Sequence, residues 1–361
     1  MPTGPAPVRE LDAATIAELT EAARRILRET RPGTPADAVS GASRPPARSG
    51  EPGTGTDGPG SGTDPVDRRV LDRVAREAAR LSERTRHHCR PVDTADGLFV
   101  LRGLPLDDAD IGPTPLSWAT VGDQAAEWDV TLLLLATAMG NPIAWEGQQD
   151  GRFVHNIVPS PGHEHEQTGA SSATLLSPHT EDAFHPGRAH LLMLACMRNH
   201  DRIATTAASV RKARLAADDV ELLSRPTLPI LPDDAYTEAQ GFTGAAPPKV
   251  PALCQTPDGP TLRYDPAYTP LDDADPAYRA AYDRLSDELA RVSVAVSLEP
   301  GDVLVVDNDL VVHGRVPFQA RYDGTDRWLK RASVRVPDRR TRPEAEKAEH
   351  GYGQAAIEAY A

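Results

Sequence analysis

Cysteine and basic residues are both scarce in this sequence. Only three cysteines, Cys89, Cys196 and Cys254, occur in 361 residues, and an odd number of widely separated cysteines argues against a disulfide framework. Lysine and arginine total 39 against 53 aspartate and glutamate residues, which gives a formal net charge of −14. Nucleic acids and anionic membrane surfaces attract positively charged faces, so this balance argues against either as a partner.

Long hydrophobic runs are also missing. The longest of them, such as residues 130–139, are far shorter than the roughly 20 apolar residues that a transmembrane helix needs. The first residues show no basic segment followed by an apolar segment, so we expect no secretory signal. These features together predict a soluble, acidic protein of the cytoplasm.

Glycine and proline, by contrast, are abundant. The 27 glycines and 34 prolines make up about 17% of the chain, above the roughly 12% of an average protein. Fifteen of them fall within residues 31–65, a tract that contains one large aliphatic residue, Val39. Such a tract buries too little apolar surface to offset the entropy lost on ordering, so we predict a flexible insertion there.

The rest of the sequence shows helical patterns first and short strands afterwards. The predicted helices are residues 8–30, 67–86, 131–139 and 275–292. Asp275 is suited to cap the last of them, and short apolar runs bounded by turn residues fill much of the chain beyond residue 97. This order favours an α+β fold with a β-sandwich or jelly-roll core buttressed by helices. We expect an N-terminal helix within residues 1–30 and one domain over residues 66–361.

Two chemically active residues lie close together near the middle of the chain. His179 and Glu181 are two positions apart, and in an extended segment such residues point to the same face. They would present one imidazole and one carboxylate to a common point. Taken alone, this pattern is more typical of a solvated polar loop.

A third candidate ligand, His313, ends an apolar run and precedes a glycine. A single histidine at a strand end is more often structural than a metal ligand. Together with His179 and Glu181, however, it completes two imidazoles and one carboxylate. That set binds one face of Fe(II) and leaves three coordination positions open. No cysteine lies near these residues in the sequence to favour structural zinc, so the set predicts a non-haem iron site.

An arginine pair follows the third candidate ligand. Arg327 opens a predicted strand in which alternation places Arg327, Leu329 and Arg331 on one face. A guanidinium binds a carboxylate through two hydrogen bonds, as an oxygenase that uses 2-oxoglutarate requires. The alternative interpretation is an exposed edge strand whose basic residues deter aggregation. The iron ligands upstream favour the first interpretation.

These residues and their neighbours give the sequence a family resemblance. It resembles the clavaminate-synthase-like branch of the Fe(II)/2-oxoglutarate dioxygenases, especially the hydroxylases of free amino acids in peptide-antibiotic biosynthesis. The similarity covers roughly residues 65–345, and its last segment is the most specific. The matching segments are residues 147–151, 163–169, 179–185, 194–199, 230–233 and 312–331.

The resemblance implies a fold, a cofactor and a reaction. The fold would be a distorted double-stranded β-helix (jelly roll), with Fe(II) bound by His179, Glu181 and His313. Arg327 would hold 2-oxoglutarate, and dioxygen would be the oxidant. A free polar amino acid would be hydroxylated, at C3 by preference, with release of succinate and carbon dioxide.

The resemblance also assigns residues to the head of the amino-acid substrate. Gln148 matches a glutamine that orients the head, and Gln149 is a possible substitute. Glu181 is placed to contact the α-amino group as well as the metal. Arg331 matches the arginine that holds the α-carboxylate.

The binding of the substrate side chain is less well matched. A lid loop at about residues 215–250 would bring Asp233 to the substrate, with Asp234 a close second. The relatives carry an Asp-x-Asp pair for a guanidinium, whereas the matching segment here has Asp265 and then Ala267. The second acid is therefore missing. Arginine is favoured, while asparagine, ornithine and carbamoylated analogues remain open.

Three other functions remain possible from the sequence. The same fold could oxidise an amino acid tethered to a carrier, or could desaturate or cyclise its substrate. A chain of a different class, a binding protein with a decayed site, is the non-enzyme alternative. The presence of both candidate histidines, the glutamate and Arg327 argues against that last interpretation.

Overall fold

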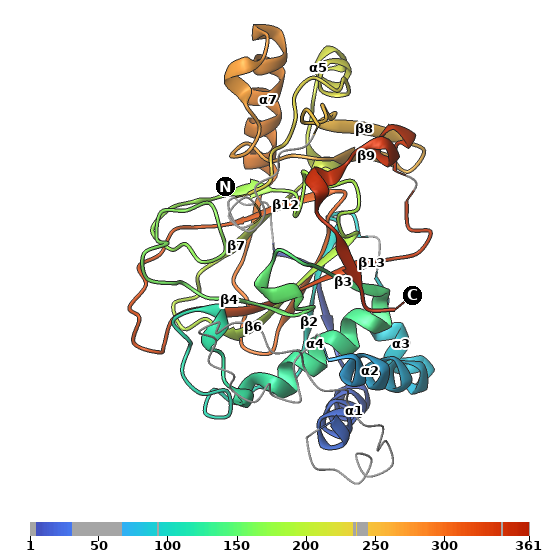
Figure 1. The fold of residues 1–361 in the computed structure, drawn as a ribbon, viewed down its shortest axis with the longest axis vertical. Helices are drawn as coiled ribbons and strands as arrows, with labels where there is room; N and C mark the ends of the chain where they lie inside the picture. The colour runs from blue at the N-terminus through green and yellow to red at the C-terminus, as the bar shows by residue number, and fades with distance from the viewer. Residues whose placement is uncertain are drawn as a thin grey trace, which may run out of the picture.

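The computed structural model describes residues 5–30, 67–91, 94–233, 236, 245–340 and 342–360. The predicted flexible insertion at residues 31–65 lies outside these residues, as do residues 234–235 and 237–244 of the predicted lid loop. Within the described part, helices and strands are mixed along the chain in an α+β arrangement (Figure 1). Every helix found there is too short or too polar to span a bilayer.

The larger of two central β-sheets has eight strands. They are β1 (Val8–Glu10), β2 (Leu98–Arg102), β3 (Asn141–Trp145), β4 (His155–Ile157), β6 (Leu191–Arg198), β11 (Val303–Asp307), β13 (Trp328–Arg335) and β14 (Ala356–Glu358). Their order is β1–β2–β11–β6–β13–β3–β14, and β4 also pairs with β13. The β1–β2 pair is parallel, and the other pairs are antiparallel.

The smaller central sheet has four antiparallel strands. In spatial order they are β10 (Val294–Val296), β7 (Thr205–Ser209), β12 (Val311–Arg315) and β5 (Leu176–His179). A separate two-stranded hairpin consists of β8 (Leu253–Thr256) and β9 (Gly259–Leu262). The two strands β5 and β12 carry the predicted histidines, so this sheet positions the candidate site.

The central strand β6 is buried on both faces, which explains its unbroken apolar sequence. One face joins a core shared with the first helices, through Leu191, Met193, Ala195 and Met197. The other face joins a second core that includes residues of the small sheet, through Leu192, Leu194 and Cys196. The large sheet is therefore packed between a helical layer and the small sheet.

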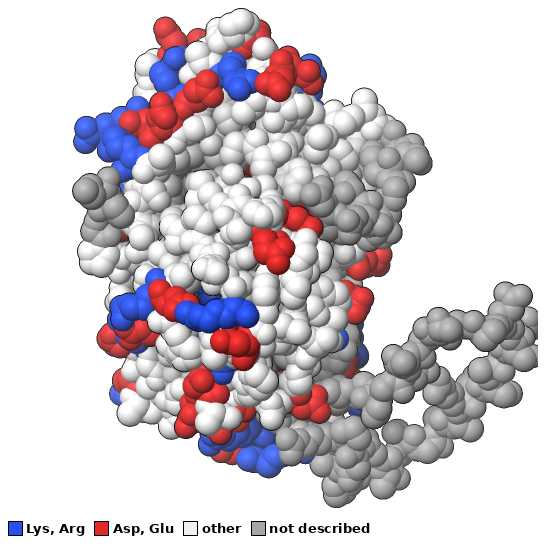
Figure 2. All heavy atoms as spheres, turned by 90° about the vertical axis from the view of Figure 1, so that its left-hand side faces the viewer, with Lys and Arg blue, Asp and Glu red and all other residues white. Residues whose placement is uncertain are grey.

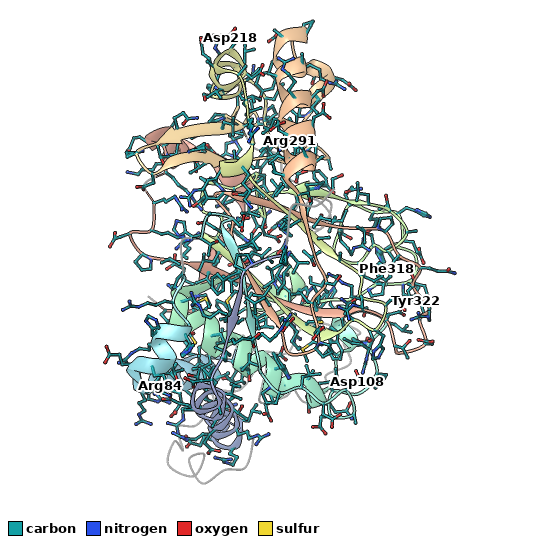
Figure 3. All side chains as sticks on the ribbon, turned by 180° about the vertical axis from the view of Figure 1, so that it is seen from behind. Arg84, Asp108, Asp218, Arg291, Phe318 and Tyr322 are labelled. Carbon is teal, nitrogen blue, oxygen red and sulfur yellow. The ribbon has the colours of Figure 1, made fainter. Side chains whose placement is uncertain are left out.

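Helices lie at both ends of the molecule (Figure 1). At one end are α1 (Ala13–Thr30), α2 (Arg68–Arg80), α3 (Glu83–His88) and α4 (Ala126–Met139), and α4 packs against β13. At the other end α5 (Ala217–Leu223) packs against α7 (Pro276–Val292). Figure 3 shows the same division, with Arg84 at one end and Asp218 and Arg291 at the other. On the face shown in Figure 2, acidic and basic side chains lie beside one another near these ends.

The helix predictions are partly correct. The helix at residues 275–292 is confirmed, and the side chain of Asp275 accepts hydrogen bonds from two backbone N–H groups of its first turn. The segment 67–86 is two helices, because Ser82 caps α3 and interrupts the pattern. The segment 8–30 also differs, since Val8–Glu10 forms the strand β1 instead of helix.

One buried ion pair joins the helical layer to the large sheet. Lys330 of β13 is fully buried, and its Nζ donates to Asp129 of α4 at 2.5 Å and to Asn156 of β4 at 2.9 Å. Removing one member of a buried pair leaves the other charge without compensation, which costs about 3–5 kcal/mol. Because Lys330 lies between the two arginines of the predicted active site, this pair also fixes the strand that carries them.

We therefore expect Lys330→Met to lower the free energy of unfolding by about 3 kcal/mol or more. The methionine fills the space of the aliphatic stem but removes the ammonium group that pairs with Asp129. Chemical denaturation measures the change. Lys347→Met is the matched control, because Lys347 makes only an exposed pair with Glu344 and should change stability by less than about 1 kcal/mol. Equal losses in the two variants would contradict the expectation.

Candidate metal centre and active site

Two histidines face each other across the small sheet. The strands β5 and β12 pair with His179 opposite His313, so both side chains lie on one face and their ring centroids are 4.4 Å apart. The Nδ1–H of His179 donates to the carbonyl of Ser177 at 2.8 Å. In the neutral ring this bond places the lone pair of His179 on Nε2, the atom that points toward the acid described next.

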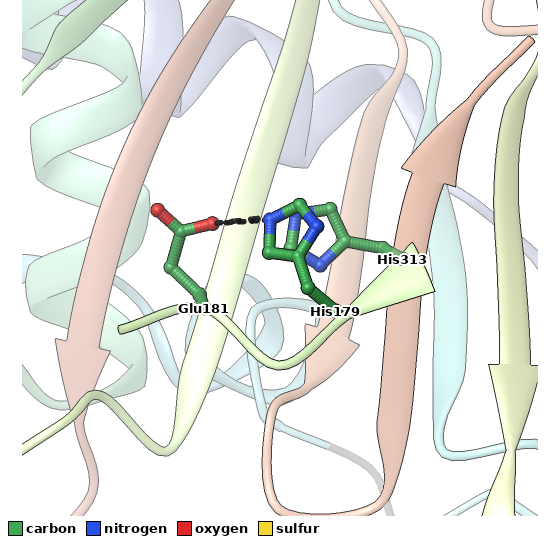
Figure 4. Close-up of side chains that lie close together, drawn as sticks. All are labelled: His179, Glu181 and His313. Carbon is green, nitrogen blue, oxygen red and sulfur yellow. Dashed lines mark ion pairs between the residues drawn. The ribbon is translucent and has the colours of Figure 1, made fainter. Parts of the chain in front are cut away.

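Glu181 lies in the turn after β5 and directs its carboxylate at both rings (Figure 4). Its Oε2 is 3.3 Å from Nε2 of His313 and 3.7 Å from Nε2 of His179. One ligand atom from each residue lies within 4.8 Å of the others. The structure thus brings together the three residues that the sequence predicts as iron ligands. It is the only such group of His, Cys, Asp and Glu among the described residues.

The electrostatics of this group favour a bound cation. Burial alone would raise the pKa of Glu181, but the charge of Arg331 and hydrogen bonds from both histidines hold it well below its usual range. Burial would lower the pKa of His179, yet Glu181 and Asp265 raise it to about 9. Burial and the charge of His179 lower the pKa of His313. A carboxylate that stays ionised between two imidazoles is a site for a positive charge.

The donor set fits ferrous iron. Two imidazole nitrogens and one carboxylate oxygen converge from a strand end, a turn and a facing strand, and all three residues line the cavity. This is the two-histidine, one-carboxylate arrangement that non-haem iron oxygenases use. Structural zinc sites usually have four protein ligands and often use cysteine, and neither feature is found here among the described residues.

Arg331 occupies the wall of the same cavity next to the metal ligands. Its guanidinium forms an ion pair with Glu181 and donates to Oε1 of Gln148 at 2.9 Å. It also donates to Nδ1 of His155 at 2.6 Å, and these two residues are opposite each other on β13 and β4. Burial and the charge of Arg331 lower the pKa of His155 to about 3, so the ring stays neutral and accepts this bond.

The structure distinguishes the two glutamines. Gln148 lies against Arg331 in the cavity, as described above. Gln149 instead uses its whole amide on the backbone of Asn156, accepting from N–H at 2.9 Å and donating to the carbonyl at 3.0 Å. Both glutamines line the cavity, but the amide of Gln149 is engaged by the backbone, whereas that of Gln148 contacts Arg331.

Arg327 directly precedes β13, which begins at Trp328 instead of at Arg327 as predicted, and it lines the same cavity as Leu329 and Arg331. The side chain is about 9% exposed, and burial lowers the pKa of its guanidinium to about 10. One nitrogen donates to Oγ1 of Thr205 at 2.9 Å, while the buried Nε finds no hydrogen-bond partner among the described residues. A buried guanidinium with donors to spare is suited to an incoming carboxylate.

Two of the acids predicted to bind substrate, Asp233 and Asp265, line the cavity, which has a volume of about 520 Å³. Burial, then the charges of Asp182 and Glu181, raise the pKa of Asp233 to about 7. Burial also raises the pKa of Asp265, whose Oδ1 accepts from the backbone N–H groups of Ala267 and Tyr268. Asp234, the second candidate in the lid loop, lies outside the described residues.

Asp182 is a buried acid that the sequence analysis did not identify. It follows Glu181, has a positive φ of 52°, and accepts hydrogen bonds from Trp145 at 2.7 Å and from Tyr236 at 2.6 Å. Burial and the charge of Glu181 raise its pKa to about 6. Its position next to Glu181 was the only indication in the sequence, because its hydrogen-bond partners Trp145 and Tyr236 come from distant segments. His155 and Thr205 were missed for the same reason.

Comparison with known proteins gives the same site a family. The family model described as "Taurine catabolism dioxygenase TauD, TfdA family" matches residues 129–333, more than half of the chain. The chain belongs to this family. It is 36% identical over 291 residues to the enduracididine beta-hydroxylase of Streptomyces hygroscopicus, covering 74% of this chain and 85% of that protein. It is 32% identical over 260 residues to the L-ornithine/L-arginine 3-hydroxylase of Catenulispora acidiphila, covering 66% and 76%.

Solved structures agree with this assignment. The oxygenase OrfP in complex with Fe, succinate and (3S)-hydroxy-L-Arg matches with a TM-score of 0.74 at 32% identity, over 91% of this chain and 94% of that one. Asparagine oxygenase in complex with Fe(II), 3-hydroxyasparagine and succinate matches with a TM-score of 0.74 at 28% identity, over 91% and 93%. This TauD/TfdA family member is thus a 2-oxoglutarate-dependent dioxygenase that uses iron and dioxygen.

The geometry of Arg327 predicts a selective effect on 2-oxoglutarate. We expect Arg327→Lys to raise KM for 2-oxoglutarate by about 10- to 100-fold, because lysine cannot form two parallel bonds to a carboxylate. Iron affinity should stay unchanged. Steady-state kinetics and Fe(II) titration measure the two quantities. Arg321→Lys is the control, since Arg321 is half-exposed and pairs with Asp201. An unchanged KM in Arg327→Lys would rule out this role.

Proposed function

We propose that this dioxygenase hydroxylates a free polar amino acid, arginine or an arginine-like analogue, at C3, in antibiotic or other secondary-metabolite biosynthesis. The observation that carries the proposal is the contact of Arg331 with both Glu181 and Gln148 beside the metal ligands. The cationic Arg331 matches the α-carboxylate of a free amino acid. The anionic Glu181 and the amide oxygen of Gln148 match its α-ammonium group. Relatives described as hydroxylases of enduracididine, arginine and ornithine support the same class of substrate.

We also propose that the core is a jelly roll. The strands β4, β5, β6, β7, β10, β11, β12 and β13 follow one another in the chain apart from the β8–β9 hairpin. In space they form β4–β13–β6–β11 in one sheet and β5–β12–β7–β10 in the other. The first strand in the chain thus pairs with the last, and the second with the seventh. A double-sheet jelly roll of eight strands has this nested order.

Two arginines of the cavity would bind different carboxylates. At one end the guanidinium of Arg327 would hold a carboxylate of 2-oxoglutarate, with Thr205 fixing its orientation. At the other end Arg331 would bind the α-carboxylate of the substrate. Bound iron supplies the oxidative decarboxylation of 2-oxoglutarate and the oxidation of a substrate C–H bond.

The α-amino group of the substrate would lie against the oxygens of Glu181 and Gln148. In the structure these oxygens accept hydrogen bonds from Arg331. A zwitterionic amino acid provides one anion for the arginine and one cation for the acceptors, so no buried charge loses its partner when the substrate enters. The α-amino and α-carboxylate groups of the substrate are then fixed. Which carbon lies nearest the iron depends on its distance from these two groups.

Asp233 and Asp265 would bind the substrate side chain. Both are half-buried acids on the cavity wall, and both have raised pKa values, so a cationic side chain would restore their ionisation. The residue two positions after Asp265 is Ala267, so only one acid is supplied by that segment. This supports either a cation smaller than a guanidinium, or a guanidinium that is not bound by two acids of this segment.

A mass-spectrometric screen tests the proposed substrate class. With Fe(II), ascorbate and 2-oxoglutarate, we expect arginine, ornithine or a related cationic amino acid to gain one oxygen as succinate forms. Asparagine, citrulline and carrier-tethered arginine belong in the same panel. Conversion of the tethered amino acid alone would refute the role of Arg331, because a tethered substrate has no free α-carboxylate.

The raised pKa of Asp233 predicts a pH dependence. Above a pKa of about 7 the carboxyl is ionised and binds a cation, so kcat/KM for a cationic substrate should rise as the pH increases from about 6 to about 8. Asp233→Asn should remove this rise and raise KM by roughly tenfold. Asp258→Asn, on an exposed turn, is the control. A pH profile that is the same in wild type and Asp233→Asn would contradict the assignment.

A further inference from the structure

The turn between β11 and β12 carries an asparagine that binds the backbone of a metal ligand. Asn308 is fully buried. Its Oδ1 accepts from the N–H of Glu181 at 2.8 Å, and its Nδ2 donates to the carbonyl of Glu181 at 3.0 Å. A third bond runs from Nδ2 to the carbonyl of Ala189 at 3.2 Å. One side chain therefore satisfies both backbone groups of the only carboxylate among the three ligands.

The sheet itself does not hold Glu181. The strand β5 has four residues, none of them fully buried, and it ends at His179. Its pairing with β12 is irregular, with a shift of register between His313 and Arg315. The carboxylate ligand lies beyond that pairing, so its distance from His313 has to be fixed by other contacts. The bonds from Asn308 join the two ligand-bearing segments, because Asn308 lies five residues before His313 in the same hairpin.

The turn that holds Asn308 is itself anchored by buried ion pairs on both sides. Asp307 accepts from Arg339 at 2.7 Å and from Arg340 at 2.5 Å. Asp309 accepts from Arg342 at 3.0 Å. Both carboxylates are about 97% or more buried, so their charges depend on these arginines. The C-terminal segment thus fixes the position of the turn relative to the large sheet.

We propose that Asn308 is a positioning residue for the iron site: it sets the backbone of Glu181 so that the carboxylate meets His179 and His313. The inference rests on the iron chemistry of the family and is independent of which amino acid is oxidised. Residues behind metal ligands commonly change metal affinity by about 10- to 100-fold when they are replaced. A positioning role therefore predicts a change in iron binding and in the spectrum of the bound metal.

The chain offers a matched control in Asn199. This asparagine is also buried, accepts from the N–H of Ile203 at 2.9 Å, and donates to the carbonyls of Ile203 and Leu298 at 3.1 and 3.0 Å. It makes three backbone bonds of the same kind as Asn308, but none of them is to a metal ligand. Replacing either by alanine removes the same number of hydrogen bonds, so loss of structure alone would affect both variants alike.

The test compares Asn308→Ala with Asn199→Ala in the absence of any amino acid. We expect the Kd for Fe(II) to rise about 10- to 100-fold in Asn308→Ala and to stay unchanged in Asn199→Ala, at comparable melting temperatures. Co(II) serves as a second probe, since its visible absorption reports ligand geometry and should shift only in Asn308→Ala. A wild-type Kd and an unshifted Co(II) spectrum in folded Asn308→Ala would overturn the proposal.

A second variant keeps the test decisive where the alanine variant does not fold. Asn308→Asp retains an acceptor for the N–H of Glu181 but loses the donor to both carbonyls. We expect its Kd for Fe(II) to exceed that of the wild type, and an unchanged Kd would overturn the proposal. Because metal binding is measured without substrate, failure to hydroxylate any amino acid would bear on the proposed function and leave this result standing.

Discussion

The antiparallel pairing of β5 with β12 is the constraint on which the active site depends. It sets His179 opposite His313, and the turn after β5 then needs only two residues to deliver Glu181 to the same point. The pairing is short and irregular, so it defines the site without rigidly holding it. The hydrogen bonds of Asn308 and the buried ion pairs around it hold the turn in place, which a four-residue strand does not do by itself.

Residues whose roles follow from local spacing were predictable from the sequence. The His-x-Glu pair and the alternation of Arg327 with Arg331 depend on strand geometry alone, and the structure brings each set together. The helix at residues 275–292 was equally local, because its cap and its apolar stripe are adjacent. The segment 67–86 was misjudged for the converse reason: a capping serine within a continuous helical pattern divides it.

Residues whose roles depend on distant partners were not predictable. His155 meets Arg331 across a gap of 176 positions, and Asn308 meets Glu181 across 127. Nothing in the segments around them indicates these contacts, since each is an ordinary polar residue beside an apolar run. Asp182 and Trp145 belong to the same class. The metal ligands are thus recognisable from local sequence spacing. The residues that hold them in place come from distant segments and are brought together only by the topology of the two sheets.

The positions of Arg327, directly before β13, and of Arg331, within β13, have a consequence for selectivity. They are four residues apart, so a rise of about 3.3 Å per residue separates their Cα atoms by roughly 13 Å. On the proposed function, the backbone from Arg327 into β13, rather than flexible side chains, would set the interval between two bound carboxylates. A slip of one residue would turn both guanidinium groups out of the cavity together. On the proposed function, the two arginines and the iron ligands would fix how far the oxidised carbon lies from the α-carboxylate, independently of the acids Asp233 and Asp265 that would bind the substrate side chain.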